Sequence, residues 1–488
     1  MKKTLRFLLV GAATLASIPV LAGPVYHPPG ANLTYGDVTH GMRVQSASSN
    51  PAAAAADRGR RPDGNIQGTA ISAAAGLEYG NIQEIWDFYD RISRAFAPSD
   101  PGDGGGGPGQ DPGDKPDGGI NIGDILDGVN PDIGTALDAL VNEVVTQTAI
   151  LALIEAEGYG RAWLAADVPV VVGTEYLGGT WTFGLGWSGN ARAFGIAEPV
   201  DFDVDAARDA IQGWIDDLPL LGPQIEIGDI ILTPRPGENA VFFQIDNDSS
   251  LVSKGTQTGE FNMGYSREGW SNAHGTLFWG VEGHVYVKRL SRLSVRYGDI
   301  TDSEELFDEI RNLDYRTDEG IGVDVGVLWV ADCYQLGAQL TNVNQPTFEF
   351  PDVNLSPYSS ELIISFLEAD QRYVMDRQLK LEASLFGRDR RWSVNLGADA
   401  NAATDPLGDE YQWATLSAGY SMDNRWLPNV RLGYRQNLAG TELGYLSVGF
   451  TAFEHINFDV ASALDTVKIG GTTLPRGLMM SIGFQVNW

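Results

Sequence analysis

Cysteine is almost absent from this chain of 488 residues, which contains only Cys333. A single cysteine excludes an intramolecular disulfide and any Cys-x-x-Cys redox or zinc motif. Basic residues are also scarce, because 33 Lys and Arg stand against 64 Asp and Glu, a net charge of −31. This acidic balance argues against nucleic acid as a partner and against binding to anionic membrane surfaces.

Long hydrophobic runs are missing after the N-terminus. A transmembrane helix needs roughly 18 or more consecutive apolar residues. The best candidate, 137–154, is interrupted by Asp138, Asn142 and Glu143. If the mature chain enters a membrane, we therefore expect it to cross as strands.

The N-terminus resembles a secretory signal. Lys2, Lys3 and Arg6 precede a short apolar stretch that ends in small residues. A basic start, a short apolar segment and a small-residue exit are typical of a cleaved signal peptide. We expect residues 1–22 to be removed after Ala22, which takes away three positive charges and changes the net charge from −31 to −34. The alternative interpretation is a buried N-terminal helix.

Motifs that carry chemistry are also missing. No two histidines stand at metal-ligand helical spacing, and there is no Gly-x-Ser-x-Gly element, P-loop or dinucleotide fingerprint. His284 beside Glu282 is a candidate for a lipase-like site with a serine; the alternative is a solvated histidine on a polar face. We predict no catalytic residues, no metal site and no cofactor.

The second half of the chain alternates apolar with polar or small residues. One phase of the last segment holds Leu478, Met480, Ile482, Phe484, Val486 and Trp488, and the other holds Met479, Ser481, Gly483, Gln485 and Asn487. Because successive side chains of a strand point to opposite faces, this segment is a strand with one oily and one polar face. Similar rows begin at Ile321, Leu379, Trp392, Leu416 and Leu446.

Two details favour a membrane barrel over a soluble sandwich, which also alternates. The strands run about ten residues, the length that a tilted strand needs to cross a bilayer. Aromatic residues lie near strand ends, where an interfacial girdle is expected: Trp181, Trp187, Trp279, Tyr297, Trp329 and Trp392. We predict an all-β fold, a transmembrane antiparallel β-barrel of about 14–16 strands in contact with membrane lipids. Trp488 is in phase with the oily face, which is typical of outer-membrane barrels recognised by the barrel-assembly machinery.

The predicted strands lie near 67–79, 160–172, 179–191, 239–249, 257–267, 275–287, 292–298, 318–331, 334–343, 372–386, 391–402, 410–422, 429–437, 443–453, 456–464 and 477–488. Long and short connections alternate along this series, as expected if long loops are extracellular and short turns periplasmic. We divide residues 275–298 into two strands at Lys288-Arg289. If these residues form a single strand instead, the number of strands in the barrel becomes odd. Fourteen strands is the alternative total.

Helices are predicted in the long connections. Segments 81–96, 131–157 and 203–217 place apolar residues at helical spacing, the first with a capping box and the second with Asn130 as N-cap. Between the first two, 18 of the 20 residues of 100–119 are Gly, Pro or Asp, a flexible acidic linker. Its aspartates also permit a calcium interpretation, although their spacing fits no EF-hand loop.

Several motifs resemble one outer-membrane family. They are Pro24-Val25-Tyr26-His27-Pro28-Pro29-Gly30, Asn50-Pro51-Ala52 within 47–55, Gly76-Leu77-Glu78-Tyr79-Gly80-Asn81, Asn342-Val343-Asn344-Gln345-Pro346 and Leu432-Gly433-Tyr434-Arg435-Gln436-Asn437-Leu438-Ala439-Gly440. In this order they resemble the family named conjugal transfer protein TraF, itself similar to FadL-type barrels for hydrophobic molecules. The resemblance spans most of 24–488, and the linker at 100–119 is an insertion relative to it.

The resemblance implies a domain organisation. After the signal peptide, residues 23–64 would form an N-terminal hatch that plugs the lumen, and residues 65–488 would form the outer-membrane barrel, with a helical insertion at 81–158. Asn50 and Pro51 would then lie in the hatch and act in gating. The alternative interpretation of Asn50-Pro51 is a simple turn.

Three functions are compatible with this sequence. The first is a passive uptake channel for a hydrophobic small molecule, the ligand that the resemblance implies. The second is an envelope scaffold associated with conjugal transfer or secretion machinery. The third, an outer-membrane enzyme using His284, is not expected.

Overall fold

The computed structural model describes residues 30–39, 44, 49–60, 67–80, 119–120, 133–173, 178–216, 224–235, 240–300, 309–310, 312–422, 426–469 and 472–488. The predicted signal at 1–22, the helix at 81–96 and the linker at 100–118 lie outside these residues.

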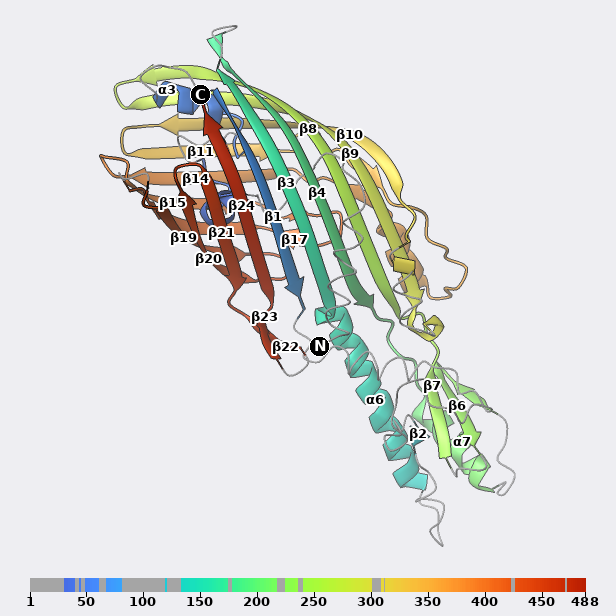
Figure 1. Cartoon of the computed structure of the whole chain (residues 1–488). Helices are drawn as coiled ribbons and strands as arrows, with labels where there is room; N and C mark the ends of the chain where they lie inside the picture. The colour runs from blue at the N-terminus through green and yellow to red at the C-terminus, as the bar shows by residue number, and fades with distance from the viewer. Residues whose placement is uncertain are drawn as a thin grey trace.

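Fourteen antiparallel strands form a closed barrel (Figure 1). Along the chain they are β1 (Gln67–Tyr79), β3 (Tyr159–Gly173), β4 (Thr180–Ile196), β8 (Ser250–Asn272), β9 (Gly275–Arg296), β10 (Arg316–Val330), β11 (Tyr334–Thr341), β14 (Gln378–Phe386), β15 (Trp392–Asp399), β18 (Trp413–Tyr420), β19 (Asn429–Asn437), β20 (Gly444–Ala452), β21 (Ile456–Ala463) and β24 (Gly477–Asn487). Each strand pairs with the next one along the chain, and β1 pairs with β24 from Gly68↔Asn487 to Glu78↔Gly477. This seam leaves the barrel without an open edge.

The apolar row of each alternating strand faces outward and the polar row faces inward, as the sequence predicts. On β24 the apolar row Leu478, Met480, Ile482 and Phe484 is 44–57% exposed on the outer wall, whereas Met479, Ser481 and Gln485 are buried inside. Outer residues of the other strands are likewise large and apolar, and inner residues are mostly small or polar. An oily exterior around a polar interior is the pattern of strands that cross a bilayer. The predicted fold class is therefore confirmed.

Aromatic side chains form part of a girdle near the short-turn end of the barrel. Trp181 packs against Tyr265, Tyr265 against Trp279, and Trp270 against Trp329, with ring centroids 5.0–6.0 Å apart. Tyr297, which was also predicted for the girdle, is only 3% exposed and lies in a short 3₁₀ turn at the opposite end of β9.

The prediction of sixteen strands was wrong in two places, and fourteen is correct. Residues 240–245 form β7, but this strand pairs with β6 (Ile230–Arg235) in a separate small sheet. The split at Lys288-Arg289 does not occur, because β9 runs unbroken through both residues, with Lys288 buried inside the barrel. The expected connection at 250–256 is also strand, since it is the first part of β8.

Long connections gather at one end of the barrel and tight turns at the other (Figure 1). The longest carry α6 (Ile133–Glu157), α7 (Val204–Asp216) and the small sheet of β2 (Gly119–Ile120), β5 (Ile225–Ile227), β6 and β7, which project beyond the barrel. Helices α6 and α7 confirm the predictions for 131–157 and 203–217. In the described residues, no helix has the length and apolar character to span a bilayer.

The end of the barrel that carries the tight turns can be located by labelling. Cys333 is exposed in the turn between β10 and β11. If this end faces the periplasm, a membrane-impermeant maleimide should label Cys333 only after the outer membrane is permeabilised. A Cys333→Ser, Asp205→Cys variant places the thiol on exposed α7 instead and should be labelled in intact cells. Labelling of Cys333 in intact cells would show that the orientation is reversed.

Candidate functional site

Two segments that precede β1 lie inside the barrel. Residues 30–39, which include α2 (Asn32–Tyr35), pack against β18, β19, β20 and β21. Residues 49–60, which include α3 (Ala53–Arg60), pack against β4, β8, β9 and β10. We call these two segments together the hatch. Because they contact opposite sides of the wall, they obstruct the lumen across its width.

Asn50 and Pro51 both form a turn and lie in the lumen. The backbone N–H of Ala52 donates to Asn50 Oδ1 at 2.9 Å, and the N–H of Ala53 donates to Asn50 O at 2.9 Å. This is how an asparagine caps a helix, and the proline suits a first turn because it lacks an N–H to satisfy. The alanines that follow are small enough for α3 to approach Phe278 and Leu328 of the wall closely. Both interpretations of the motif are compatible with this geometry.

Two paired wall glycines make room for this turn. Gly280 of β9 and Gly326 of β10 are direct partners in the sheet. A Cβ atom at Gly280 would lie 2.2 Å from Pro51 O, and one at Gly326 would lie 2.1 Å from Asn50 Oδ1. Real Cβ atoms do not approach other atoms so closely, so only glycine at these two positions leaves room for the Asn50-Pro51 turn. We call the space left by a pair of wall glycines a notch.

The other half of the hatch sits in a similar notch. A Cβ atom at Gly419 would lie 2.4 Å from the Tyr35 hydroxyl, and one at Gly433 would lie 2.3 Å from Thr34 O. The Thr34 hydroxyl donates to the Asp459 carboxylate, which also accepts from the Arg431 guanidinium. Arg431 and Asp459 are buried together, so each charge has its partner.

An ion pair joins the end of this half to the wall. Asp37 accepts from the Lys380 ammonium of β14. Burial acts to raise the pKa of the Asp37 carboxyl, but the charge of Lys380 and its hydrogen bond outweigh burial and hold that pKa below its ordinary value. The carboxylate therefore stays ionised to a lower pH than a free carboxylate. The stability it contributes is present above the ordinary pKa and is lost as the pH falls through the lowered pKa.

Glu382 of β14 contacts both halves of the hatch. It accepts from the backbone N–H of Thr39, from the Thr39 hydroxyl at 2.7 Å and from Asn50 Nδ2 at 3.2 Å. Gln335 of β11 donates from Nε2 to Thr39 O at 3.0 Å. This small region of wall therefore satisfies polar groups of the chain on either side of residues 40–48.

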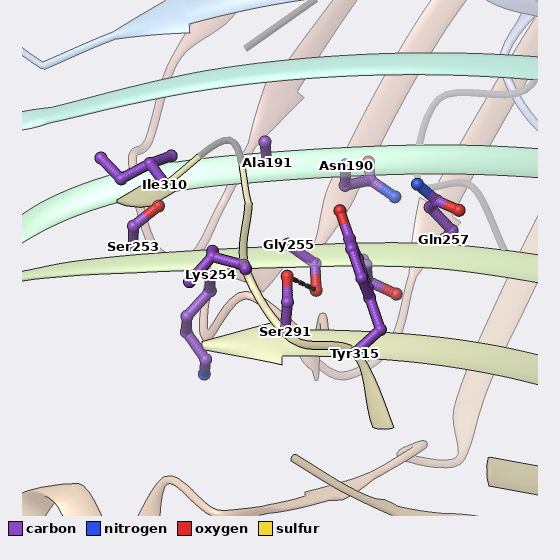
Figure 2. Close-up of a pocket in the computed structure, with 11 residues that line it drawn as sticks. Asn190, Ala191, Ser253, Lys254, Gly255, Gln257, Ser291, Ile310 and Tyr315 are labelled. Carbon is purple, nitrogen blue, oxygen red and sulfur yellow. Dashed lines mark hydrogen bonds between the residues drawn. The ribbon is translucent and has the colours of Figure 1, made fainter. Parts of the chain in front are cut away.

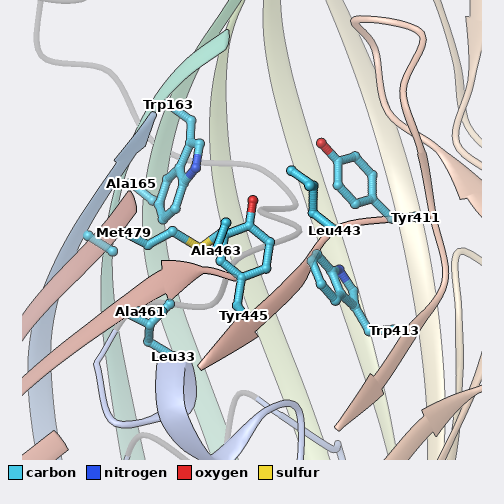
Figure 3. Packing of buried hydrophobic residues seen from close by; sticks show 11 residues of the cluster. Leu33, Trp163, Ala165, Tyr411, Trp413, Leu443, Tyr445, Ala461, Ala463 and Met479 are labelled. Atoms are coloured by element: carbon cyan, nitrogen blue, oxygen red, sulfur yellow. The ribbon is translucent and has the colours of Figure 1, made fainter. Parts of the chain in front are cut away.

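A buried apolar cluster lies in the lumen beside the hatch. Its members are Leu33, Ala74, Trp163, Ala165, Tyr411, Trp413, Leu443, Tyr445, Ala461, Ala463 and Met479. Figure 3 shows the rings of Trp163, Tyr445 and Trp413 converging above Leu33, which rises from the hatch helix α2. We call it the luminal apolar cluster. Apolar and aromatic linings are typical of sites that bind small hydrophobic molecules.

A loop covers this cluster on the side away from the hatch. Residues 403–411, with β16 (Ala403–Thr404) and β17 (Glu410–Tyr411), are called here the strap. Its Asp405 and Asp409 are buried and both pair with Arg161 of β3, while Arg192 of β4 pairs with Asp409 at 3.0 Å. Tyr411 of the strap belongs to the luminal apolar cluster. The cluster is thus enclosed between the hatch and the strap.

Two cavities lined by described residues are small. One lies where Ile310, Leu313 and Tyr315 face strands β4, β8 and β9 beside Lys254, Gly255 and Ser291 (Figure 2). The other lies beside Asp37, Lys380 and Arg435. Their volumes of about 30 and 20 Å³ hold a water or two. In this state neither has room for a hydrophobic solute.

His284 lies inside the barrel, on the polar face that the sequence predicts. Its Nδ1 contacts Glu260, and its Nε2 lies 3.6 Å from Asp324. These neighbours are carboxylates, whereas the lipase-like hypothesis requires a serine at the ring. The geometry gives that hypothesis no support.

Glu382, Gly280 and Gly326 are functional candidates that the sequence analysis missed. Two signals for the glycines were available, since both fall in the inward phase of predicted strands and glycine in a strand often marks close approach of another backbone. Glu382 fell in the polar phase of a strand row, but nothing local distinguishes it from its polar neighbours.

These features together define a transmembrane β-barrel whose lumen is plugged by its own N-terminal segment. The family model described as "F plasmid transfer operon, TraF, protein" matches residues 47–399, and the chain belongs to that family. The resemblance noted in the sequence is thereby confirmed. The comparison with curated protein sequences found no match.

The solved structures to which the chain is similar include the following three. They are "TodX deltaS2S3 mutant monoaromatic hydrocarbon channel" (10% identity, TM-score 0.41, 96% of this chain and 99% of that one), a Pseudomonas aeruginosa FadL homologue (11%, 0.39, 96% and 99%) and the Ralstonia pickettii toluene transporter TbuX (10%, 0.40, 95% and 100%).

Replacement of two glycines of β9 by alanine should have different effects on the hatch, because only one of them, Gly280, contacts it. Gly280→Ala places a methyl group against Pro51 and should displace the hatch, at an overpacking cost of about 1–3 kcal/mol. Trypsin should then cut within 49–60 faster than in the native protein. Gly283→Ala is the matched control, because a Cβ atom there has no neighbour within 4 Å. Equal cleavage rates in both variants would show that the notch does not hold the hatch.

Proposed function

We propose that this protein is an outer-membrane channel for passive uptake of hydrophobic small molecules, with residues 23–64 as its movable hatch. The observation that carries the proposal is the luminal apolar cluster. An aromatic-lined patch among many polar inward side chains offers an apolar solute a place to bind inside the barrel. The position of this patch between the hatch and the strap is what a transient binding site on an uptake path requires.

The cluster couples solute binding to the hatch through Leu33. This side chain is fully buried and packs among cluster residues of the wall. A solute that occupies the cluster competes with Leu33 for the apolar surface of the wall. It therefore weakens the packing of α2 against the wall, and no strand of the barrel needs to move. Asn50 and Pro51 are proposed to set the closed position at the other half, because the paired glycines fit that turn.

The charge distribution is consistent with long loops that face the exterior. Connections 80–158 and 197–249 hold 27 Asp or Glu and 5 Lys or Arg, most of the net charge of the chain. An acidic cap of this kind keeps the projecting loops solvated and discourages self-association. Apolar solutes carry no charge, so this field does not oppose their approach.

Uptake by cells tests the proposal directly. Cells that express the protein should accumulate a radiolabelled hydrophobic compound, such as a long-chain fatty acid or an alkane, faster than cells without it. Ala461→Trp fills the cluster and should lower that rate about tenfold, the effect of roughly 1.4 kcal/mol. Ala452→Trp, on the outer row of β20, is the control and should leave uptake unchanged.

Heat-modifiable gel mobility must first show that both tryptophan variants fold. Folded Ala461→Trp protein with native uptake would argue against the cluster as the path. Absence of uptake for every hydrophobic compound tested, by a folded native protein in the outer membrane, would contradict the function itself.

A second candidate is an envelope scaffold, and the projecting unit of α6, α7 and the small sheet favours it. Such a unit is not needed to line a pore. Replacement of 201–245 by a short Gly-Ser linker separates the two functions, since this segment lies outside the barrel strands. The channel proposal predicts native uptake by this variant. Loss of conjugal transfer or secretion with native uptake would instead support the scaffold.

A further inference from the structure

We propose that Glu382 of β14 is the positioning residue that sets the closed state of the hatch, by holding both of its halves at one carboxylate. The inference deepens the proposed function and rests on it, because it concerns how the same hatch is retained.

The contacts of Glu382 come from two stretches of chain that residues 40–48 separate. One carboxylate oxygen accepts from the Thr39 N–H, and the other accepts from the Thr39 hydroxyl at 2.7 Å and from Asn50 Nδ2 at 3.2 Å. Glu382 is only 8% exposed and Asn50 only 2%. Buried hydrogen bonds to an ionised acceptor are stronger than those between neutral groups.

The wall is shaped around this side chain. Gly337 of β11 pairs with Glu382 in the sheet, and a Cβ atom at Gly337 would lie 2.3 Å from Glu382 Oε1. The missing side chain lets the carboxylate fold back over β11 toward the hatch. Next to it, Gln335 holds the carbonyl of Thr39. The carboxylate therefore meets the hatch in one geometry, with its donors already in place.

Other contacts between the wall and the described residues of the hatch act on one half at a time. Asp37 with Lys380 and Thr34 with Asp459 act on residues 30–39. Ala55, whose N–H donates to Ser266 Oγ at 3.1 Å, acts on residues 49–60. Glu382 is bonded to both halves, which are also joined to each other by the hydrogen bond from Asn32 Nδ2 to Ser49 Oγ at 2.9 Å. Loss of Glu382 therefore loosens both halves from the wall at the same time.

An amide at this position cannot replace the carboxylate. Glu382→Gln keeps the shape of the side chain but leaves a single acceptor oxygen, and it turns an NH₂ group toward Thr39 or Asn50, which are themselves donors. Some of these buried donors then lose their partner, and an unpaired buried donor is costly. The barrel strands keep their own hydrogen bonds, so the change is confined to the hatch.

Hydrogen–deuterium exchange of the purified full-length protein in detergent tests this directly, with no solute present. In Glu382→Gln, amides of both 30–39 and 49–60 should exchange at least about tenfold faster than in the native protein. Single-channel recordings should show more frequent openings. Exchange in strands such as β20 and the heat-modifiable gel shift should stay native, which a general loss of stability would not allow.

The matched control is Asp324→Asn. Asp324 is also a buried luminal carboxylate, but its partners are Asn342, Gln339 and His284, none of which belongs to the hatch. This variant should show native exchange at 30–39 and 49–60. Native hatch exchange in folded Glu382→Gln, or equal acceleration in both variants, would overturn the proposal.

A test from the hatch side does not depend on how Glu382→Gln folds. Thr39→Val removes the hydroxyl donor to Glu382 but keeps the shape of the side chain and the cap that Asn50 forms on α3, so it should accelerate exchange of 30–39 in an intact barrel. Added to Glu382→Gln, it should accelerate exchange much less than it does in the native background. Full additivity would overturn the proposal. Because neither experiment measures uptake, their failure is distinguishable from failure of the channel function.

Discussion

The structure depends on one constraint: in a bilayer, every backbone N–H and C=O of a strand must find its partner within the protein. The seam between β1 and β24 meets this constraint, because it converts a sheet with two open edges into a closed ring. Closure then fixes the two faces. Outward rows such as Leu478 to Phe484 must be apolar, whereas inward rows are free to be polar, since lipid never reaches them.

The polar lumen explains how the chain plugs itself. A wall rich in small and polar side chains offers hydrogen bonds and notches that the hatch can use, and the glycine pair at Gly280 and Gly326 is the clearest example. Several polar contacts of the hatch are made by side chains of the wall, so they are separate from the backbone hydrogen bonds that pair the strands. Buried apolar clusters interrupt this polarity. One of them is the luminal apolar cluster, which Leu33 links to the hatch, and another places Phe278 and Leu328 against α3.

The barrel was largely predictable from the sequence, since its side-chain period is a local property of each strand. The prediction was wrong for β7, because a strand can be recognised in the local sequence but its partner cannot, and β7 pairs with β6 rather than with a strand of the barrel. Lys288-Arg289 suggested a break where none exists, because the inward side chain of this pair is satisfied inside the lumen. The partners of Glu382 and Asp459 could not be predicted, since they depend on the register of strands and hatch segments hundreds of residues apart.

The central claim, a closed barrel with an oily exterior, is tested most directly by sedimentation of the folded protein without its first 22 residues, with and without detergent. The account predicts a monodisperse species only in detergent or lipid, and aggregation when these are withdrawn, because the outward apolar rows would then face water. A monodisperse, folded protein in plain buffer would contradict it.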